Sequence, residues 1–352
     1  MIYYVYKSFR TREVDVKTAT NKATEDVNAI LSSIGAQPYE IILPVKKRSV
    51  VSLVKNHIYS IMSFKKLISK LKHNDIVVIQ HPKCGSSSVV KFLKSAKRKQ
   101  VKTVLLIHDL YLLRDNIESG DKQVKFKKNE KIILTLADNI ICHNASMHKY
   151  IEDLGISNEK LIDLGIFDYL YSGEIITERT KTNSFTVAGN LSPNKAGYIY
   201  DYMNSNQTCE MNLFGVGFDS KDGSGHTHYF GAKLPNELPQ HLIGSFGLVW
   251  DGPSAETCSG NTGNYLRYNN PHKCSLYLAS NLPVVIWDEA ALAPFIKENG
   301  LGITVQNLGE IADAINQISE KEYNDILKNV MEVGNKIRSG YYLKEAFSQI
   351  AI

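Results

Sequence analysis

The stretch that decides the fold is "DIVVIQHPKCGSSSVVKFLKSAKRKQVKTVLLIHD", residues 75–109. It begins and ends with short apolar runs, 75–81 and 103–109, which predict strands. Between them, residues 89–99 carry apolar side chains at helical spacing. Because the two runs are apolar without alternation, we expect strands buried on both faces, as in a parallel sheet that helices cover.

The alternation of strand and helix continues on both sides of this stretch. Further strands are predicted at 2–7, 40–45 and 139–144, and then at 185–189, 211–216, 246–250, 284–288 and 302–305. A polar segment, 171–183, separates the two sets. We therefore predict α/β architecture, with doubly wound parallel-sheet domains at 1–170 and 184–337. A C-terminal helical segment, 338–352, is expected to pack back toward the first domain. Ligands of such sheets bind beyond the carboxyl ends of the strands, so a cleft shared by the domains is the expected site.

Composition places the chain among ordinary globular proteins. The 352 residues are 43% hydrophobic and 22% charged. The five cysteines are dispersed and form no metal-binding or CxxC spacing, which indicates reduced thiols in a cytoplasmic protein. The apolar start is short and followed at once by charge, so we read a first strand and not a secretory signal. No apolar run approaches the roughly 18 residues of a membrane-spanning helix.

Charge is divided unevenly along the chain. Residues 1–170 hold 28 Lys and Arg against 17 Asp and Glu, a net charge of +11, and the remainder has a net charge of −6. A basic half suits an anionic membrane surface, a phosphate-bearing ligand or nucleic acid; a merely solvated surface is the alternative. Nucleic acid is the least favoured, because aromatic residues are not interleaved with the basic ones in a stacking pattern.

The most unusual polar stretch is "NPHKCS", residues 270–275, directly before an apolar helical run. Pro271 suits the entry of a helix, and the first turn of a helix presents unpaired N–H groups and the positive end of its dipole. Lys273 adds a full charge there. The combination predicts an anion site, best matched to phosphate. The alternative is a helix that merely begins with a lysine.

Three other features follow predicted strands. Gly189 and Asn190 form a Gly-Asn turn that can hold a ligand or cap a helix. His108 and Asp109 end the strand at 103–109, where a carboxylate can act as general base or merely cap a loop. There is no Asp-x-Asp in the chain, so a metal ion clamping a diphosphate has no obvious ligands.

Several of these segments resemble one family. The stretch "FGLVWDGPSAETCSGNTGNYLRYNNPHKCSLYLASNLPVVIWDEAALAPF", residues 246–295, resembles the bacterial β-1,6-galactofuranosyltransferases of O-antigen and capsule gene clusters. Shorter matches are "LIHDLYLLR" (106–114), "CHNASMHKYI" (142–151), "IFDYL" (166–170) and "AGNLSPNKAGYIY" (188–200). A more distant resemblance is to the glucosyltransferase 3 type enzymes that extend glycans on bacterial adhesins.

The resemblance implies a GT-B fold, two Rossmann-like domains that face each other across a cleft. It also implies a UDP-sugar donor in the second domain, a glycan acceptor in the first, inversion at the anomeric carbon and no metal or other cofactor. Lys273 and Thr18 match UDP contacts of the glucosyltransferase 3 relatives. Where those relatives have an arginine after the Gly-Asn turn, this chain has Pro193, and Lys195 is the expected substitute. The full set of expected donor-binding residues is Thr18, Gly189, Asn190, Lys195, Gly231, Asn270, Pro271, His272, Lys273, Cys274, Ser275 and Leu276.

The resulting hypothesis is an inverting, metal-independent glycosyltransferase of surface polysaccharide biosynthesis. It would move galactofuranose from UDP-galactofuranose in a β-1,6 linkage, with Asp109 as base and His108 beside it. The alternatives are a UDP-glucose-type hexosyltransferase of the same fold and a non-catalytic subunit on a transferase fold. The expected partners are the UDP-sugar, a glycan or lipid-linked oligosaccharide acceptor, an anionic membrane surface bound peripherally from the cytoplasm, and a second copy of the chain in a homo-oligomer; nucleic acid is not expected.

Overall fold

The computed structural model describes residues 1–352 except 10–18, 45–48, 115–120, 206–207, 220–224 and 351–352, and except the side chains of 19–20 and 121–125. The chain divides into two compact units, described separately below. The first holds residues 1–15, 27–164 and 343–352, and the second holds 16–26 and 165–342. Each contains a six-stranded sheet whose strand pairings are all parallel. The predicted fold class, two Rossmann-like domains, is confirmed.

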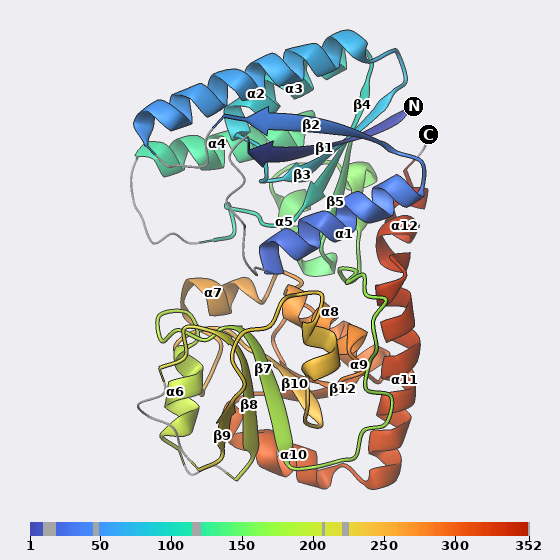
Figure 1. Cartoon of the computed structure of the whole chain (residues 1–352). Helices are drawn as coiled ribbons and strands as arrows, with labels where there is room; N and C mark the ends of the chain where they lie inside the picture. Colours follow the sequence, from blue (N-terminus) through green and yellow to red (C-terminus); the bar gives the residue numbers. More distant parts are fainter. Residues whose placement is uncertain (10–18, 45–48, 115–120, 206–207, 220–224, 351–352) are drawn as a thin grey trace. The chain divides into compact units, whose positions relative to one another are not determined.

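The sheet of the first unit has the strand order β2-β1-β3-β4-β5-β6. Figure 1 shows α2 and α3 over one face of this sheet and α1 on the other. The strand β3 is buried at every position, as its unbroken apolar sequence predicts. The strands are β1 (Ile2–Phe9), β2 (Gln37–Leu43), β3 (Ile76–His81), β4 (Lys102–Ile107), β5 (Asn139–Cys142) and β6 (Leu161–Asp163). The helices are α1 (Ala19–Ser33), α2 (Val50–Lys70), α3 (Ser86–Arg98), α4 (Asp121–Leu136) and α5 (Ala145–Asp153).

The sheet of the second unit has the order β12-β11-β10-β7-β8-β9. In Figure 1, α6 and α8 lie on opposite sides of it. The strands are β7 (Ser184–Asn190), β8 (Glu210–Val216), β9 (Thr227–Tyr229), β10 (Phe246–Val249), β11 (Val284–Trp287) and β12 (Gly302–Val305). The helices are α6 (Gly197–Met203), α7 (Gly260–Tyr265), α8 (His272–Ala279), α9 (Ala293–Glu298), α10 (Ile311–Gln317), α11 (Glu320–Arg338) and α12 (Tyr341–Ser348), the last ending within the first unit's residues.

The order of the second sheet defines where a ligand can enter. The chain leaves β7 toward β8 and β9, whereas it leaves β10 in the opposite direction, toward β11 and β12. The connections therefore diverge between β7 and β10 and leave a crevice at the carboxyl ends of these two strands. The first sheet has the corresponding point between β1 and β3.

The helix α8 is held against this point by one aromatic side chain. Tyr277 is fully buried, and its hydroxyl accepts the N–H of Ala188, near the end of β7, at 2.9 Å. Its ring occupies space that Gly247 of β10 leaves open, because a Cβ on Gly247 would lie 2.3 Å from the ring. The missing side chain of β10 thus lets α8 approach the sheet closely.

The two units differ from the predicted domains at their junctions. Residues 16–26 and 165–170 belong to the second unit, although the prediction places both in the first domain. The reason is a set of buried contacts. Lys22 donates to the carbonyl oxygen of Leu170 at 2.6 Å, and Asp26 accepts the N–H of Leu170 at 3.0 Å. The N–H of Tyr169 in turn donates to the carbonyl of Ile337 at 3.2 Å.

Substituting Gly247 by alanine tests the packing of α8. The added methyl group would overlap the buried Tyr277 ring, so we expect a loss of about 1–3 kcal/mol in the free energy of unfolding. The measurement is chemical denaturation. Gly225→Ala is the matched control, because no atom of the described residues lies within 4 Å of a Cβ at that position. Equal denaturation midpoints for the two variants would contradict this packing.

Candidate functional site

A cavity of about 430 Å³ lies at the divergence point of the second sheet, within the volume range typical of small-molecule sites. Its walls come from the carboxyl ends of β7 and β8, from the segment after β9 and from the first turns of α8. The lining residues are Tyr169, Ala188, Gly189, Asn190, Lys195, Phe214, Gly215, Val216, Ala232, Lys233, Pro235, Leu238, His272, Lys273 and Leu276.

Two glycines form the backbone wall of this cavity. Gly189 and Gly215 are paired across β7 and β8 and have φ angles of +145° and +152°. A Cβ on Gly215 would lie 1.7 Å from the carbonyl oxygen of Gly189, so only glycine fits there. Asn190 stabilises the turn that follows, because its side-chain oxygen accepts the N–H of Ser192 at 3.0 Å. The wall is therefore bare backbone that a ligand can approach closely.

The polar side of the cavity is cationic. Lys195, Lys233 and Lys273 all line it. The Lys273 ammonium donates to the carbonyl oxygen of Trp250 at 2.7 Å and lies 3.3 Å from the Asp251 carboxylate. The Lys195 ammonium lies 3.5 Å from the same carboxylate oxygen. One carboxylate thus faces two of three ammonium groups, and a net positive charge remains.

Asp251 is the main charged residue that the sequence analysis missed. It lies two residues after the end of β10 and is 14% exposed, so it stands at the carboxyl end of a central strand beside the cavity. Its signal was present in the sequence: an acidic residue directly after the apolar run at 246–250. Asp251 holds Lys273 and Lys195 close together, which fixes the positions of the two positive charges.

The first turn of α8 strengthens the positive character of the site. The helix begins at His272, and its N-cap, Pro271, contributes no side-chain hydrogen bond. The N–H groups of a first turn and the helix dipole favour an anion at this end. His272 and Lys273 both line the cavity, so the helix mouth predicted from the sequence opens onto it.

An aromatic wall faces this helix mouth. The Tyr169 ring lies 5.2 Å from the His272 ring, centroid to centroid, and its hydroxyl donates to the carbonyl oxygen of Pro235 at 2.7 Å. The Lys22 ammonium lies 4.7 Å from the same ring. The sequence analysis gave Tyr169 no role in a site, although it lies in the "IFDYL" segment quoted there.

The cavity brings together six of the predicted donor-binding residues, namely Gly189, Asn190, Lys195, His272, Lys273 and Leu276. The other predicted donor-binding residues that the structure describes lie outside its lining. Asn270 is 3% exposed and donates to the carbonyl oxygen of Gly165 at 2.9 Å, which ties the "IFDYL" segment to α8.

The remaining predicted donor-binding residues have other surroundings. Cys274 and Ser275 are buried on α8, and burial raises the pKa of the Cys274 thiol to about 12. Gly231 accepts the N–H of Gly215 at 3.0 Å next to the lining residue Ala232, and Pro271 is the N-cap of α8. Thr18 lies outside the described residues.

The predicted catalytic pair lies in the first unit, directly after β4. Asp109 is 33% exposed on its side chain and lies 3.6 Å from the Arg114 guanidinium. His108 is fixed through its Nε2 atom, which lies 2.7 Å from the side-chain oxygen of Gln80. Because the Gln80 amide nitrogen donates to Asn28 at 2.8 Å, its oxygen is the acceptor for His108. The proton of neutral His108 therefore resides on Nε2, and Nδ1 is its basic nitrogen.

A buried carboxylate shapes the segment that carries this pair. Glu130 is 1% exposed, and its two oxygens accept the N–H groups of Tyr111 at 3.1 Å and Leu112 at 2.6 Å. It also lies 2.6 Å from Nε2 of His81, at the end of β3. Glu130 thus ties α4 to the turn after Asp109. The sequence analysis missed it because it lies inside a polar helix.

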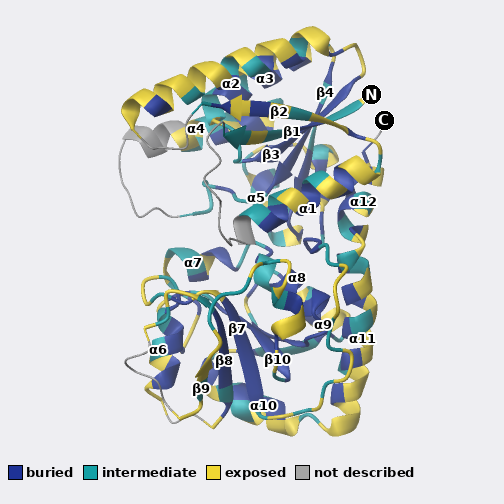
Figure 2. Ribbon diagram, in the orientation of Figure 1, coloured by how far each residue is buried: buried dark blue, intermediate teal, exposed yellow. Residues whose placement is uncertain are grey.

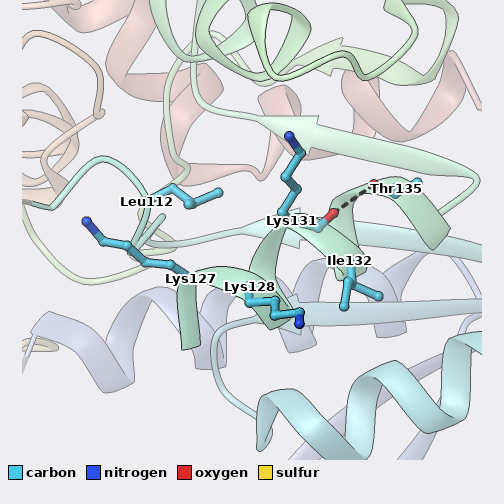
Figure 3. Close-up of a pocket in the computed structure, with 6 residues that line it drawn as sticks. All are labelled: Leu112, Lys127, Lys128, Lys131, Ile132 and Thr135. Carbon is cyan, nitrogen blue, oxygen red and sulfur yellow. Dashed lines mark hydrogen bonds between the residues drawn. The ribbon is translucent and has the colours of Figure 1, made fainter. Parts of the chain in front are cut away.

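The first unit has a second hollow, of about 490 Å³, along α4. It is lined by Leu112, Lys127, Lys128, Lys131, Ile132 and Thr135. Figure 3 shows the three lysine side chains pointing in different directions, so they do not converge on one anion. The Thr135 hydroxyl donates to the carbonyl oxygen of Lys131 in the preceding turn of α4, at 2.8 Å.

One group of metal-ligand side chains occurs among the described residues, also in the first unit: Cys142, His148 and Asp163. A single oxygen of Asp163 accepts from both other members, at 3.2 Å from the Cys142 sulfur and 2.8 Å from Nδ1 of His148. Burial and the neighbouring Asp163 raise the pKa of the Cys142 thiol, which disfavours the thiolate that a metal requires. The hydrogen bonds to Asp163 explain why these three side chains lie close together.

Known proteins match nearly the whole chain. The model of the glucosyltransferase 3-like N-terminal domain matches residues 4–166, and that of the C-terminal domain matches residues 185–350. The chain is 33% identical over 303 residues to the β-1,6-galactofuranosyltransferase WbbI of Escherichia coli K12, covering 84% of this chain and 85% of WbbI. It is 22% identical to glucosyltransferase 3 of Streptococcus parasanguinis, covering 80% of each chain.

Solved structures with a similar fold include glycosyltransferases. The lipopolysaccharide outer core galactosyltransferase WaaB aligns with a TM-score of 0.62 at 12% identity, over 99% of this chain and 98% of WaaB. The T4 phage BGT, solved with UDP and Mn²⁺, aligns with a TM-score of 0.56 at 12% identity over both whole chains. These likenesses show a GT-B type fold. The two family matches and the 33% identity to WbbI identify the chain as a glycosyltransferase that belongs to the glucosyltransferase 3-like family.

Proposed function

We propose that the chain transfers galactofuranose from UDP-galactofuranose to a hydroxyl of a glycan acceptor, with inversion and without a metal ion. The observation that carries the proposal is the cationic cavity of the second unit, where Lys195, Lys233 and Lys273 meet the first turn of α8. The choice of sugar is supported by the 33% identity to WbbI over most of both chains. The proposed acceptor is the one that the family resemblance implies: a glycan of a surface polysaccharide, carried on a lipid at an anionic membrane.

The cavity offers a separate environment for each part of a nucleotide sugar. The diphosphate carries the charge, and it would lie at the α8 mouth between Lys195 and Lys273, against the bare backbone of Gly189. The apolar wall formed by Phe214, Val216 and Leu238 suits the less polar uridine. Tyr169 and His272 provide ring faces beside the phosphates.

Lysines and a helix mouth would stabilise the leaving group as UDP departs. When the bond between sugar and phosphate breaks, negative charge grows on the diphosphate, and fixed positive charges stabilise that transition state more than the ground state. Asp251 keeps two of these charges in place before the reaction. The described residues that line the cavity include no carboxylate, and Asp251, the carboxylate beside it, faces the ammonium groups of Lys195 and Lys273.

The donor and the role of metal are tested in one assay. We expect the pure chain with a glycan acceptor to release UDP faster from UDP-galactofuranose than from UDP-glucose or UDP-galactopyranose. We also expect the rate to persist in excess EDTA, because the charge of UDP is compensated by lysines. Faster release of UDP from UDP-glucose would support the alternative function, a UDP-glucose-type hexosyltransferase. Complete loss in EDTA, restored by Mn²⁺ or Mg²⁺, would overturn the metal-independent mechanism.

Lys273→Ala tests the diphosphate position. Loss of a charge-assisted contact weakens binding by about 1.5–3 kcal/mol, roughly a 10- to 150-fold rise in the Kd of UDP. Calorimetry measures this rise, while uridine without phosphates should bind both forms equally. Lys297→Ala is the control, since Lys297 is an exposed lysine of α9 outside the cavity lining. An unchanged Kd for UDP in a folded Lys273→Ala protein would contradict the placement of the diphosphate at the start of α8.

Asp109 is proposed as the base that takes the proton of the acceptor hydroxyl. In an inverting transfer the acceptor attacks in a single displacement, so a base on the acceptor side must remove this proton. Asp109→Asn keeps the shape and removes the basicity, and we expect turnover to fall by about 10²- to 10⁴-fold. UDP affinity should stay unchanged, because the described cavity is lined only by the second unit.

The matched control for Asp109→Asn is Asp153→Asn, at an exposed carboxylate of α5. If Asp109→Asn keeps near-normal turnover while His108→Ala loses it, the base is His108, acting through the Nδ1 atom that the Gln80 contact leaves basic. Glu118, a further acidic residue that follows Asp109 in the sequence, lies outside the described residues. Normal turnover in both variants would place the base elsewhere.

A further inference from the structure

The helix α2 of the first unit exposes a continuous apolar row. Val50, Val54, Ile58 and Met62 follow one another at four-residue spacing, so they lie on one face of the helix. Their exposed fractions are 77%, 54%, 49% and 62%, and the neighbouring Val51 is 63% exposed. Isolated exposed apolar side chains are ordinary in soluble proteins, but a contiguous row is typical of a docking surface.

The opposite face of α2 is anchored, so the row cannot turn inward. Phe64 and Leu67 are at most 2% exposed, and the Phe64 ring lies 4.8 Å from the Phe92 ring of α3, centroid to centroid. Ser49 caps the helix by accepting the N–H of Ser52 at 3.2 Å. The exposed face of α2 is visible along its length in Figure 2. The apolar row is therefore a fixed feature of the surface.

The charged side chains of α2 and of the adjacent α3 are all basic. The sequence of α2 contains Lys55, Lys65, Lys66 and Lys70, all exposed, and no acidic residue. The adjacent helix α3 adds the exposed Lys91, Lys94, Lys97 and Arg98, again without an acidic residue. Lys65 and Lys91 line the same small cavity, of about 140 Å³, with residues of both helices. The basic residues Lys46, Lys47 and Arg48, which precede α2 in the sequence, lie outside the described residues.

The combination of aliphatic row and lysines identifies the partner. A second copy of the chain, packed by symmetry on this face, would place lysine against lysine. Nucleic acid would pair with the lysines but leave the aliphatic row unused. An anionic lipid bilayer satisfies both, because its acyl region takes aliphatic side chains while its headgroups pair with ammonium groups.

We propose that α2 is a membrane-docking element: Val50, Val51, Val54, Ile58 and Met62 enter the surface of an anionic bilayer, and Lys55, Lys65, Lys66 and Lys70 contact its headgroups. Docking on this surface would bring the enzyme to its lipid-borne acceptor. In that respect the inference rests on the proposed function. Binding itself needs neither donor nor acceptor. Docking by one face of a helix is peripheral. The described residues include no helix long and apolar enough to span a membrane.

The test uses the full chain and vesicles of phosphatidylcholine with or without phosphatidylglycerol, separated by flotation in a salt series. We expect the chain to bind the anionic vesicles at least tenfold better than the neutral ones, and less well as salt rises. Ile58→Asp should lower binding at least tenfold, since it puts a charge into the apolar row. Asn324→Asp makes the same change of charge on α11 and should bind like the unmodified chain.

The lysines are tested by Lys65→Glu/Lys66→Glu, with Lys321→Glu/Lys328→Glu on α11 as a control of equal charge change. Only the α2 pair should lose binding to anionic vesicles. Equal binding of both vesicle types, unchanged binding of the α2 variants, or a dimer that Ile58→Asp dissociates would each overturn the proposal. Transfer to a short soluble acceptor is measured in parallel and should be unchanged in the α2 variants, so failure of docking and failure of the sugar-transfer assignment are distinguishable.

Discussion

The packing of Tyr277 into the space beside Gly247 sets the geometry on which the candidate site depends. The ring brings α8 close to β10, and its hydroxyl receives the N–H of Ala188 at the end of β7. The start of α8 therefore lies beside the Gly189–Gly215 wall, where the connections of the sheet diverge. A bulkier residue at position 247 would push the helix away and separate the two halves of the cavity. Fold and site thus share one constraint, the close approach of a helix to a central strand.

The charged side chains of the cavity add a second constraint on the candidate site. Three lysines without compensation would repel one another, and flexible side chains would spread apart. Asp251 counters this repulsion for Lys195 and Lys273, because its carboxylate lies near both ammonium groups. The carbonyl oxygen of Trp250 also accepts a hydrogen bond from Lys273. The positive charges would therefore already be in position when a diphosphate binds. The same arrangement leaves a net positive charge, which favours a ligand of at least two negative charges over a neutral sugar.

Much of this architecture could be predicted from the sequence, because it depends on local patterns. The buried strands and the apolar helix after Pro271 are readable from short stretches, and Lys273 stands at the helix mouth as predicted. What could not be predicted depends on contacts between distant segments. The hydrogen bonds of Lys22 and Asp26 to Leu170 move two segments into the second unit. Tyr169 reaches the cavity because its neighbours pack on α8, and Asn270 supports that packing instead of facing the cavity. Gln80 meets His108 across two neighbouring strands, which no single stretch reveals.

Hydrogen–deuterium exchange with and without UDP tests the central claim most directly, because it reports where the nucleotide is held without any substitution. The account predicts slower exchange in three segments of the second unit: 189–195 from the end of β7, 231–235 after β9 and 272–276 at the start of α8. Uridine without phosphates should protect 272–276 much less, since the diphosphate is the part held by Lys273 and the helix mouth. Protection by UDP confined to other segments, with these three unchanged, would contradict the account.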